Sequence, residues 1–457
     1  MPKEKIDLGK SPVVKTFINY AIPSVLGMVT LSLAGIVDGL FIGRYVGTDA
    51  LAGVSIVYPI TSLAIGFAIM IGTGGTTTAS AEIGAGNIAA ARNTFTVTSI
   101  LVTVAATLFM ILGIIFAAPL SEFFGIKGGL EDEIRTYMTP LLLFFIPFMH
   151  AWILDVFIRN DGRPVFPSIT LVISSVINII LDYLFIVRFG WGLRGAAFAT
   201  GLSQIVPMVV FWIYICRGNT SYKLVRPVFK SRKIAHMLYN GVSEFINEFS
   251  VGLSTILFNM ALITRIGSIG VASYSIIQYM TMITLMVFFG IAQAVQPGLS
   301  YNLGVGDRDR IRAFKRIALQ TNIVISVLSL SILVLFSESI ASLFTRGDAD
   351  VIALTSQITK YYSWSFLPMG MNITISMYFT SIHYARESAI TALSRSFVLF
   401  VFFLYTLPLI FGDIGLWLTV PLAELVTLGI VAVLSLRRPL DDAYLKKTIN
   451  RLQESHE

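Results

Sequence analysis

Twelve long apolar runs, separated by short polar stretches, strongly limit the folds that this chain can adopt. Each run reaches the roughly 20 residues that a helix needs to cross a bilayer. Inside lipid the backbone polar groups must bond to one another, which a helix achieves within a single segment. The sequence therefore predicts an all-α integral membrane protein with 12 transmembrane helices, over residues 13–43, 51–80, 94–118, 134–158, 165–187, 195–216, 234–264, 269–300, 313–336, 354–381, 388–411 and 414–436.

Composition favours the lipid phase over water or nucleic acid as the surroundings of this chain. Only 13% of the 457 residues are charged, whereas soluble domains carry about 25%. The net charge of +7 could indicate a nucleic-acid partner. The charges lie mostly in short loops between apolar runs, which a membrane protein explains better. We therefore expect membrane lipid as a partner and no nucleic acid.

The distribution of Lys and Arg predicts how the chain is oriented. With the N-terminus in the cytoplasm, 25 of the 33 cationic residues fall in or beside cytoplasmic segments. Cytoplasmic loops of membrane proteins carry such an excess. We expect a multi-pass protein of the cell (inner, cytoplasmic) membrane with both termini in the cytoplasm.

The two halves of the chain resemble each other, with motifs that recur in the same order at nearly the same offset. Gly84-Ala-Gly86-Asn-Ile-Ala-Ala-Ala-Arg92 is echoed by Gly304-Val-Gly306-Asp-Arg-Asp-Arg-Ile-Arg312, and Phe145-Ile-Pro147 by Phe366-Leu-Pro368. Six spans per half is an even number, so the halves share one orientation, as in parallel transporter repeats. This predicts two six-helix bundles related by a pseudo-two-fold axis, with domains 1–225 and 226–457. Such a pair suits alternating access.

A carboxylate, Asp38, lies inside the first apolar run, where an ionised group costs about 3 kcal/mol or more. Asp38, Asp182 and Thr200 each lie six residues from an outer-loop arginine, which places them roughly 9 Å below the outer boundary. Asn178 is one helical turn from Asp182 and shares its face. Tyr137 enters the fourth span slightly shallower. The first half can thus gather these five side chains at similar depth.

The chemistry of this cluster leaves two ions open. Two carboxylates of like charge in a low-dielectric pocket favour holding a proton between them. Alternatively, carboxylate, amide and hydroxyl oxygens suit a small hard cation, which would be sodium bound by Asp38, Asn178, Asp182 and Thr200. The competing interpretation is that Asp38 or Asp182 only caps a helix or pairs locally.

Polar residues of the second half are further candidates for a cleft lining. Glu244 and Glu248 line the cleft or face cytoplasmic water. Glu424 lies near the membrane midplane and is the best acidic candidate of this half, and a pair with a hydroxyl or amide is the alternative explanation of its burial. Gln278, Gln293 and Asn259 could line a cleft or bond between helices. Two groups in the first half have local explanations: Asp155 precedes Arg159 by one turn, which predicts a salt bridge, and His150 is expected to be a hydrogen-bonded core residue.

Motifs for enzyme chemistry are absent from the sequence. There is no G-x-x-x-x-G-K-[ST] phosphate loop and no H-E-x-x-H zinc motif. The single cysteine, Cys216, excludes an intrachain disulfide. We expect no enzyme and no cofactor beyond a coupling ion, proton or sodium.

The chain resembles the multidrug and toxic compound extrusion (MATE) transporters of bacteria and archaea. The features that carry the likeness are Ala21-Ile-Pro23 opening the first helix, Asp38 fifteen residues later, Asn178-Ile-Ile-Leu-Asp182 and Gly195-Ala-Ala-Phe-Ala-Thr200. The resemblance implies a V-shaped pair of bundles. It also implies export of small organic, often cationic and amphipathic, drug-like compounds in exchange for protons or sodium.

The same resemblance assigns roles to residues. It implies that Asp38 and Asp182 are the central carboxylates, with Tyr137, Asn178 and Thr200 as their partners. Pro23 is the expected bending point of the first helix, because proline weakens a helix locally. We expect a monomer.

Three other functions stay open at this point. A flippase for lipid-linked precursors, from the same broad superfamily, would need cationic groups in its cleft, and the apolar runs hold very few. A membrane-embedded enzyme would need a nucleophile with a base, or a metal cluster. A passive channel is disfavoured by the two-half repeat and the buried carboxylate pair.

Overall fold

The computed structural model describes residues 5–123, 129–218, 220–344 and 348–454, and these residues form helices joined by short connections. The helices of the first half are α1 (Val13–Phe41), α2 (Thr48–Gly84), α3 (Ile88–Phe123), α4 (Gly129–Leu143), α5 (Phe145–Asn160), α6 (Val165–Asp182) and α7 (Gly192–Cys216). Those of the second half are α8 (Ser231–Arg265), α9 (Ser268–Val305), α10 (Arg308–Leu335), α11 (Ser337–Phe344), α12 (Ala349–Tyr362), α13 (Phe366–Ser381), α14 (Ala385–Leu393), α15 (Leu399–Phe411), α16 (Asp413–Arg437) and α17 (Asp442–Glu454).

The predicted membrane spans correspond to these helices. Within the described part of the chain, ten helices are long and apolar enough to cross a membrane, or eleven when the bent pair α4 and α5 is one span. The remaining predicted run, 354–381, falls on α12, a short 3-10 turn and α13. The all-helical membrane fold predicted from the sequence is therefore confirmed.

Both spans that contain the repeated Phe-x-Pro motif are interrupted at it. The axes of α4 and α5 bend by 51° at a break between Leu143 and Phe145. A proline in a helix lacks an N–H and clashes with the carbonyl four residues earlier, which for Pro147 belongs to Leu143. In the second half, the 3-10 turn Ser363–Ser365 comes just before Pro368. The motif thus marks equivalent breaks in the two halves.

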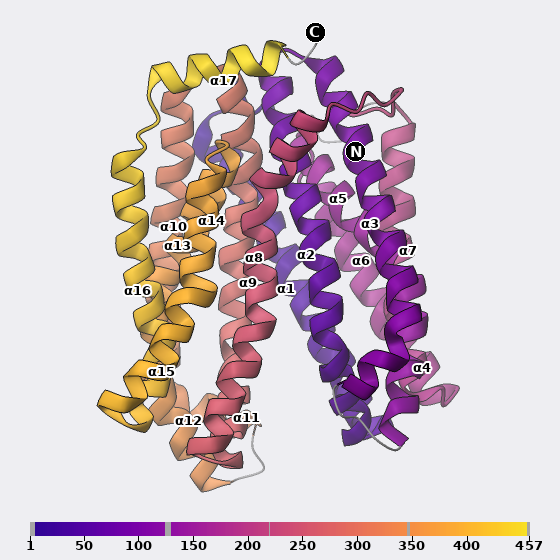
Figure 1. Ribbon diagram of the computed structural model, residues 1–457, viewed down its shortest axis with the longest axis vertical. Coiled ribbons are helices and arrows are strands. Elements are labelled where there is room, and N and C mark those ends of the chain that lie inside the picture. The colour runs from indigo at the N-terminus through magenta and orange to yellow at the C-terminus, as the bar shows by residue number, and fades with distance from the viewer. Residues whose placement is uncertain (1–4, 124–128, 219, 345–347, 455–457) are drawn as a thin grey trace.

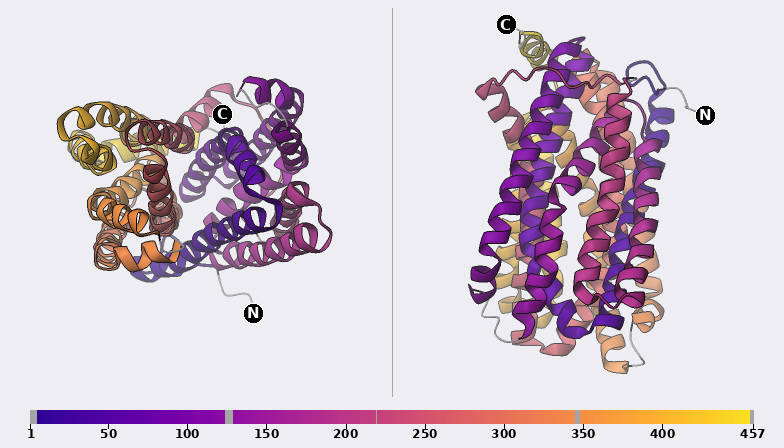
Figure 2. Two further views of the ribbon diagram at one scale, coloured as in Figure 1. Left: turned by 90° about the horizontal axis from the view of Figure 1, so that it is seen from below. Right: turned by 90° about the vertical axis from the view of Figure 1, so that its right-hand side faces the viewer.

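The helices form two bundles that lie side by side, α1–α7 in one and α8–α16 in the other (Figures 1 and 2). The bundles meet where α1 packs against α9 and α2 packs against both α8 and α9. Both chain termini lie at one end of the molecule, which we call the terminal end, and α17 crosses that end (Figure 1).

Glycines let the bundles approach closely near the terminal end. A Cβ on Gly84 would lie 2.0 Å from the carbonyl oxygen of Tyr301, and one on Gly304 would lie 1.9 Å from that of Ala81. Gly84 corresponds to Gly304 in the repeat, and Ala81 corresponds to Tyr301 at the same offset, so α2 and α9 cross near the pseudo-symmetry axis. Small residues allow such close backbone contact between membrane helices.

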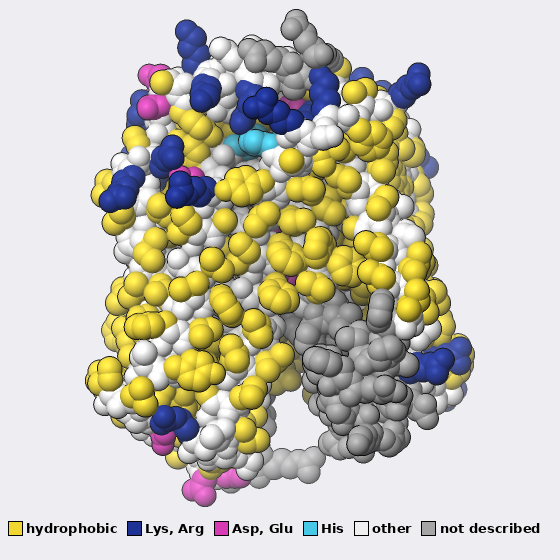
Figure 3. All heavy atoms as spheres, in the orientation of Figure 1, with side chains coloured by type: hydrophobic (Ala, Val, Ile, Leu, Met, Phe, Trp, Pro, Cys, Tyr) yellow, Lys and Arg dark blue, Asp and Glu magenta, His cyan; other side chains and the backbone are white. Residues whose placement is uncertain are grey.

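The two ends of the molecule differ on the face seen in Figure 3. On the face seen in Figure 3 the surface is hollowed between the two bundles at the end away from the termini. Lys and Arg side chains gather on the terminal end in the same view. The bundles are thus joined at the charged end and separated at the other.

Candidate functional site

Asp38 and Asp182 lie near the ends of two helices that pack against each other, α1 and α6. Asp182 is the last residue of α6, and a π-helical turn over Tyr183–Arg188 follows it directly. A second π-helical turn, Ile42–Val46, follows α1. Such turns interrupt regular helices and occur often at functional sites. Both carboxylates therefore lie beside a change in helical winding.

The two carboxyl groups face each other, within reach of a hydrogen bond if one of them holds a proton. Asp182 is 0% exposed. Both oxygens of Asp182 and Oδ1 of Asp38 are buried and have no hydrogen-bond partner among the described residues. Unpaired carboxylate oxygens in a dry site are unfavourable unless a proton or cation neutralises them. The donor set therefore fits the binding of either ion.

Asn178 and Tyr137 complete the buried part of the cluster. Asn178 lies one turn before Asp182 and is buried, and its amide nitrogen has no partner among the described residues. The Tyr137 hydroxyl is close enough to interact electrostatically with both Asp38 and Asp182. The structure thus brings together four of the five side chains predicted for this site.

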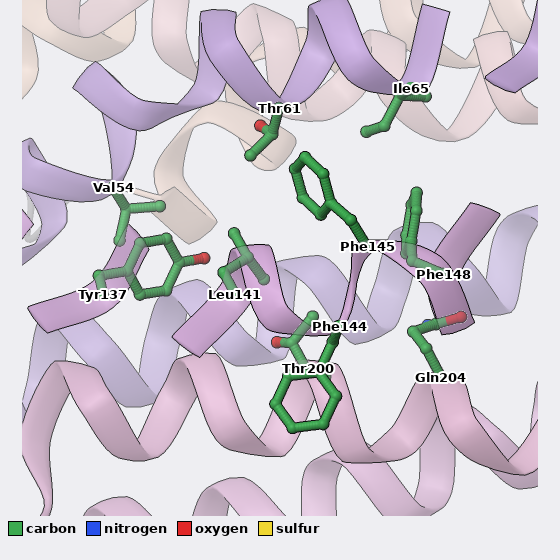
Figure 4. A pocket seen from close by; sticks show the side chains of 11 residues that line it. Val54, Thr61, Ile65, Tyr137, Leu141, Phe144, Phe145, Phe148, Thr200 and Gln204 are labelled. Carbon is green, nitrogen blue, oxygen red and sulfur yellow. The ribbon is translucent and has the colours of Figure 1, made fainter. Parts of the chain in front are cut away.

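Thr200, the fifth predicted residue, lines a cavity that also reaches Tyr137 (Figure 4). The cavity measures about 160 Å³ and lies between α2, the α4–α5 break and α7. Its walls are mostly apolar, with Phe144, Phe145 and Phe148 at the break. Sites for drug-sized ligands usually measure about 300–1,000 Å³, so this cavity suits waters and an ion better than a drug.

Glu244 and Glu248 lie on α8, on the side of the second bundle that meets the first. The hydroxyl of Ser62 on α2 lies 3.3 Å from Oε1 of Glu248 and 3.2 Å from its backbone oxygen, so it can donate to either. Glu244 interacts electrostatically with Arg395 and with Glu248. These acids are therefore placed where the bundles face each other, which keeps the cleft prediction open.

Glu424 has an ion-pair partner that sequence reasoning missed. Arg395 donates to Oε1 of Glu424 at 2.9 and 3.1 Å, and Asn372 donates to Oε2 at 2.7 Å. Both charged side chains are buried. A cationic residue inside the apolar run 388–411 was the available signal, because intramembrane charges rarely lack a partner.

The uncharged candidates of the second half differ in their bonding. Gln278 donates to the hydroxyl of Tyr274 on its own helix at 2.9 Å. The side-chain oxygens of Gln293 and Asn259 are buried without a partner among the described residues. Gln278 thus bonds locally, while the other two retain free acceptors.

The two local explanations in the first half are confirmed. Arg159 forms a buried bidentate pair with Asp155 at 2.9 to 3.0 Å, and it also donates to Ser24 on α1. His150 lies 2.8 Å from the hydroxyl of Thr103 and is buried. Both groups stabilise the first bundle.

A duplicated helical membrane fold with a buried carboxylate pair defines a membrane transporter of two bundles. The MatE family model matches residues 23–184 and again residues 245–406, once in each half. The chain therefore belongs to the multidrug and toxic compound extrusion (MatE) family. The order and spacing of the two matched segments agree with the repeat seen in the sequence.

Curated relatives and solved structures of the family resemble nearly the whole chain. The probable multidrug resistance protein YoeA of Bacillus subtilis is 28% identical over 375 residues, which is 79% of this chain and 80% of the relative. Multidrug export protein MepA of Staphylococcus saprophyticus is 25% identical over 448 residues, with 95% and 97% covered. A MATE family multidrug transporter solved in an outward-facing conformation is 21% identical, covers 99% of this chain and 100% of its own, and has a TM-score of 0.88.

Proposed function

We propose that this protein is a secondary antiporter that exports small organic, drug-like compounds by alternating access, driven by protons or sodium. The unpaired, buried carboxylate oxygens of Asp38 and Asp182 are the observation that carries the proposal. Relatives named for multidrug export or resistance support the substrate class.

The proposed orientation follows from charge. With the cation-rich terminal end in the cytoplasm, the hollow between the bundles opens to the outside (Figure 3). A proton or cation then reaches the Asp38–Asp182 pair from outside, by way of the first bundle. Drug and ion occupy different places, because the cavity beside Tyr137 is smaller than the sites that usually hold drug-sized ligands.

Ion binding acts through the helices that hold the pair. While both carboxylates are charged, they repel each other and favour separation of α1 from the end of α6. Neutralisation removes that repulsion and lets α1 repack, with Pro23 as the place where it can bend. α1 runs unbroken through Pro23 here. Because α1 also packs on α9 of the other bundle, a change in α1 alters the contact between bundles. The ion shifts the equilibrium only by its preference for one state over the other.

A test of the pair is Asp38→Asn, which keeps the side-chain size and removes the charge. We expect loss of ion-coupled dye efflux from proteoliposomes, with an unchanged melting temperature. Asp413→Asn is the matched control, because Asp413 is exposed at the start of α16, and it should transport normally. Full drug resistance in cells that carry Asp38→Asn would contradict the proposal.

An imposed proton gradient, then an imposed sodium gradient, identifies the coupling ion in the same vesicles. Efflux that occurs with only one of the two gradients identifies the ion of that gradient as the coupling ion. Efflux driven by neither gradient would contradict antiport and favour a flippase or a channel.

A further inference from the structure

The N-terminal segment, residues 5–11, is held by both bundles. On the first bundle, Lys5 pairs with Asp161 at 2.8 Å, and the backbone of Ile6 donates to the carbonyl of Gly162 at 3.1 Å. On the second bundle, Arg310 donates to the carbonyls of Leu8 at 2.7 Å and Ser11 at 2.9 Å. The segment therefore lies across the junction and is bonded on both sides.

The N-terminal segment also packs closely against both bundles, in addition to its hydrogen bonds. Leu8 is 5% exposed and packs in a core cluster with Leu303 and Ile311 of the second bundle. Gly162 has φ +84, and a Cβ there would lie 2.8 Å from the carbonyl oxygen of Ile6. Asn302 adds a further bond to the carbonyl of Leu8 at 3.2 Å.

The C-terminal helix α17 also bonds to both bundles. On the second bundle, the Tyr444 hydroxyl donates to the carbonyl of Ile382 at 2.8 Å, and Arg451 lies 3.0 Å from Nε2 of His236. On the first bundle, the amide of Asn87 donates to the carbonyl of Leu452 at 3.2 Å. Leu452 itself is buried.

The loops that receive the two chain ends are the repeated glycine motifs. The N-terminal segment docks beside 304–310 in the second half, and α17 docks on 84–87 in the first half and beside Gly306. Gly84 and Gly304 also form the close crossing of α2 and α9. Both chain ends are therefore anchored where the bundles come closest.

We infer that the N-terminal segment and α17 form a two-part clasp, which holds the bundles together at the terminal end and sets how readily that end opens. Opening the cleft at the terminal end separates α2 from α8 and α9, so bonds from each chain end to one of the bundles must break. Each part of the clasp thus stabilises the closed terminal end. This inference rests on the alternating access proposed above.

The test measures opening directly, without transport. Thr77 on α2 is fully buried and accepts a bond from Asn240 of the other bundle at 3.0 Å. In a Cys216→Ser background, Thr77→Cys reports opening through its rate of labelling by a charged maleimide, measured on the full-length protein in detergent. Lys5→Ala, Arg310→Ala and Asn87→Asp each loosen the clasp. Asn87→Asp removes the donor to Leu452 but keeps the side-chain oxygen that caps α3.

We expect each clasp variant to raise the labelling rate roughly tenfold, because losing hydrogen bonds of a charged or buried group shifts an equilibrium by about that factor. Lys10→Ala and Arg312→Ala are the matched controls, since both side chains are exposed on the same elements, and they should label at the parent rate. Rates for all three clasp variants within twofold of the parent would overturn the inference.

A second reporter separates opening from unfolding. Ala196 is fully buried within the core of the first bundle, so Ala196→Cys should stay unlabelled in every clasp variant. Labelling of both reporters would overturn the inference, because the chain ends would then stabilise a bundle rather than the junction. Ion-coupled efflux is assayed separately. If the clasp variants label faster but the parent protein shows no ion-coupled efflux, the antiporter proposal is wrong and the clasp inference still holds.

Discussion

At the scale of single residues, carboxylates inside this membrane fold differ by their partners. Glu424 has a guanidinium and an amide, and Asp155 has a guanidinium, whereas Asp182 has no hydrogen-bond donor among the described residues. A paired buried charge is already neutralised, so it has little to gain from an incoming ion. A buried carboxylate without a partner is stabilised much more by a bound proton or cation. This difference separates structural acids from the pair proposed for coupling.

Glu424→Gln should destabilise the second bundle strongly. The change removes the carboxylate that is hydrogen-bonded to the buried Arg395 and leaves only the electrostatic interaction with Glu244. Breaking a buried pair costs about 3 kcal/mol or more, and the melting temperature should fall by several degrees. The control Glu338→Gln alters an exposed carboxylate and should have no effect. The double change Glu424→Leu with Arg395→Leu should be milder than Glu424→Gln alone. Equal melting temperatures for Glu424→Gln and the parent would refute a stabilising role for the pair.

At the scale of elements, interrupted helices shape the first-half site. The break between α4 and α5 places Phe144 against Gly201 of α7, where a Cβ on the glycine would lie 2.0 Å from the ring. This contact sets the distance between the break and α7, and so the width of the cavity between Tyr137 and Thr200. The break lies where Pro147 cannot donate a hydrogen bond to the carbonyl of Leu143. Gly201, which has no side chain, allows the Phe144 ring to pack against α7.

Gly201→Ala should therefore destabilise the first bundle by about 1–3 kcal/mol, the usual cost of overpacking. Thermal unfolding of the purified protein measures this. Gly429→Ala is the control, because a Cβ there meets nothing within 4 Å. Adding Phe144→Leu to Gly201→Ala should restore part of the loss. A fully stable Gly201→Ala protein would show that the ring yields without cost.

At the scale of the whole molecule, the bundles touch at the terminal end and part at the other. The contact depends on backbone approach at Gly84 and Gly304, on the packing of α1 and α2 against α8 and α9, and on the two chain ends that cross the junction. In the alternating access proposed above, the transporter changes state by exchanging one closed end for the other. On that proposal, contacts remote from the carboxylates help to set the balance between the two ends.

Gly84→Ala and Gly304→Ala should each weaken the closed terminal end. The added methyl must push α2 and α9 apart, and overpacking of about 1–3 kcal/mol corresponds to a shift of roughly tenfold. The Thr77→Cys labelling rate should rise and the rate of efflux should fall. Gly252→Ala, with open space around its Cβ, should leave both rates unchanged. Parent-like labelling in both variants would show that the crossing opens without these contacts.

Much of the fold could be predicted because a lipid bilayer permits few backbone structures, since the backbone polar groups must bond to one another. Apolar length predicted the spans, and the matched motifs, such as those that begin at Gly84 and Gly304, predicted two bundles. The spacing from loop arginines placed Asp38, Asp182 and Thr200 at one depth, and the helical period placed Asn178 one turn from Asp182. The structure brings Asp38, Asp182 and Asn178 together, and Thr200 lines the adjoining cavity. The domain boundary near residue 225 and the cytoplasmic position of the termini stay predictions.

Only the tertiary structure decided which polar groups meet across long stretches of sequence. Arg395 pairs with Glu424 29 residues away, and Arg310 reaches Leu8 over 302 residues. No local pattern encodes such pairs, since they depend on how helices pack against one another. The sequence by itself determined which segments enter the membrane, because burial of apolar surface and backbone hydrogen bonding act segment by segment. Packing between segments decided which carboxylates have a cationic partner and which have no hydrogen-bond donor among the described residues.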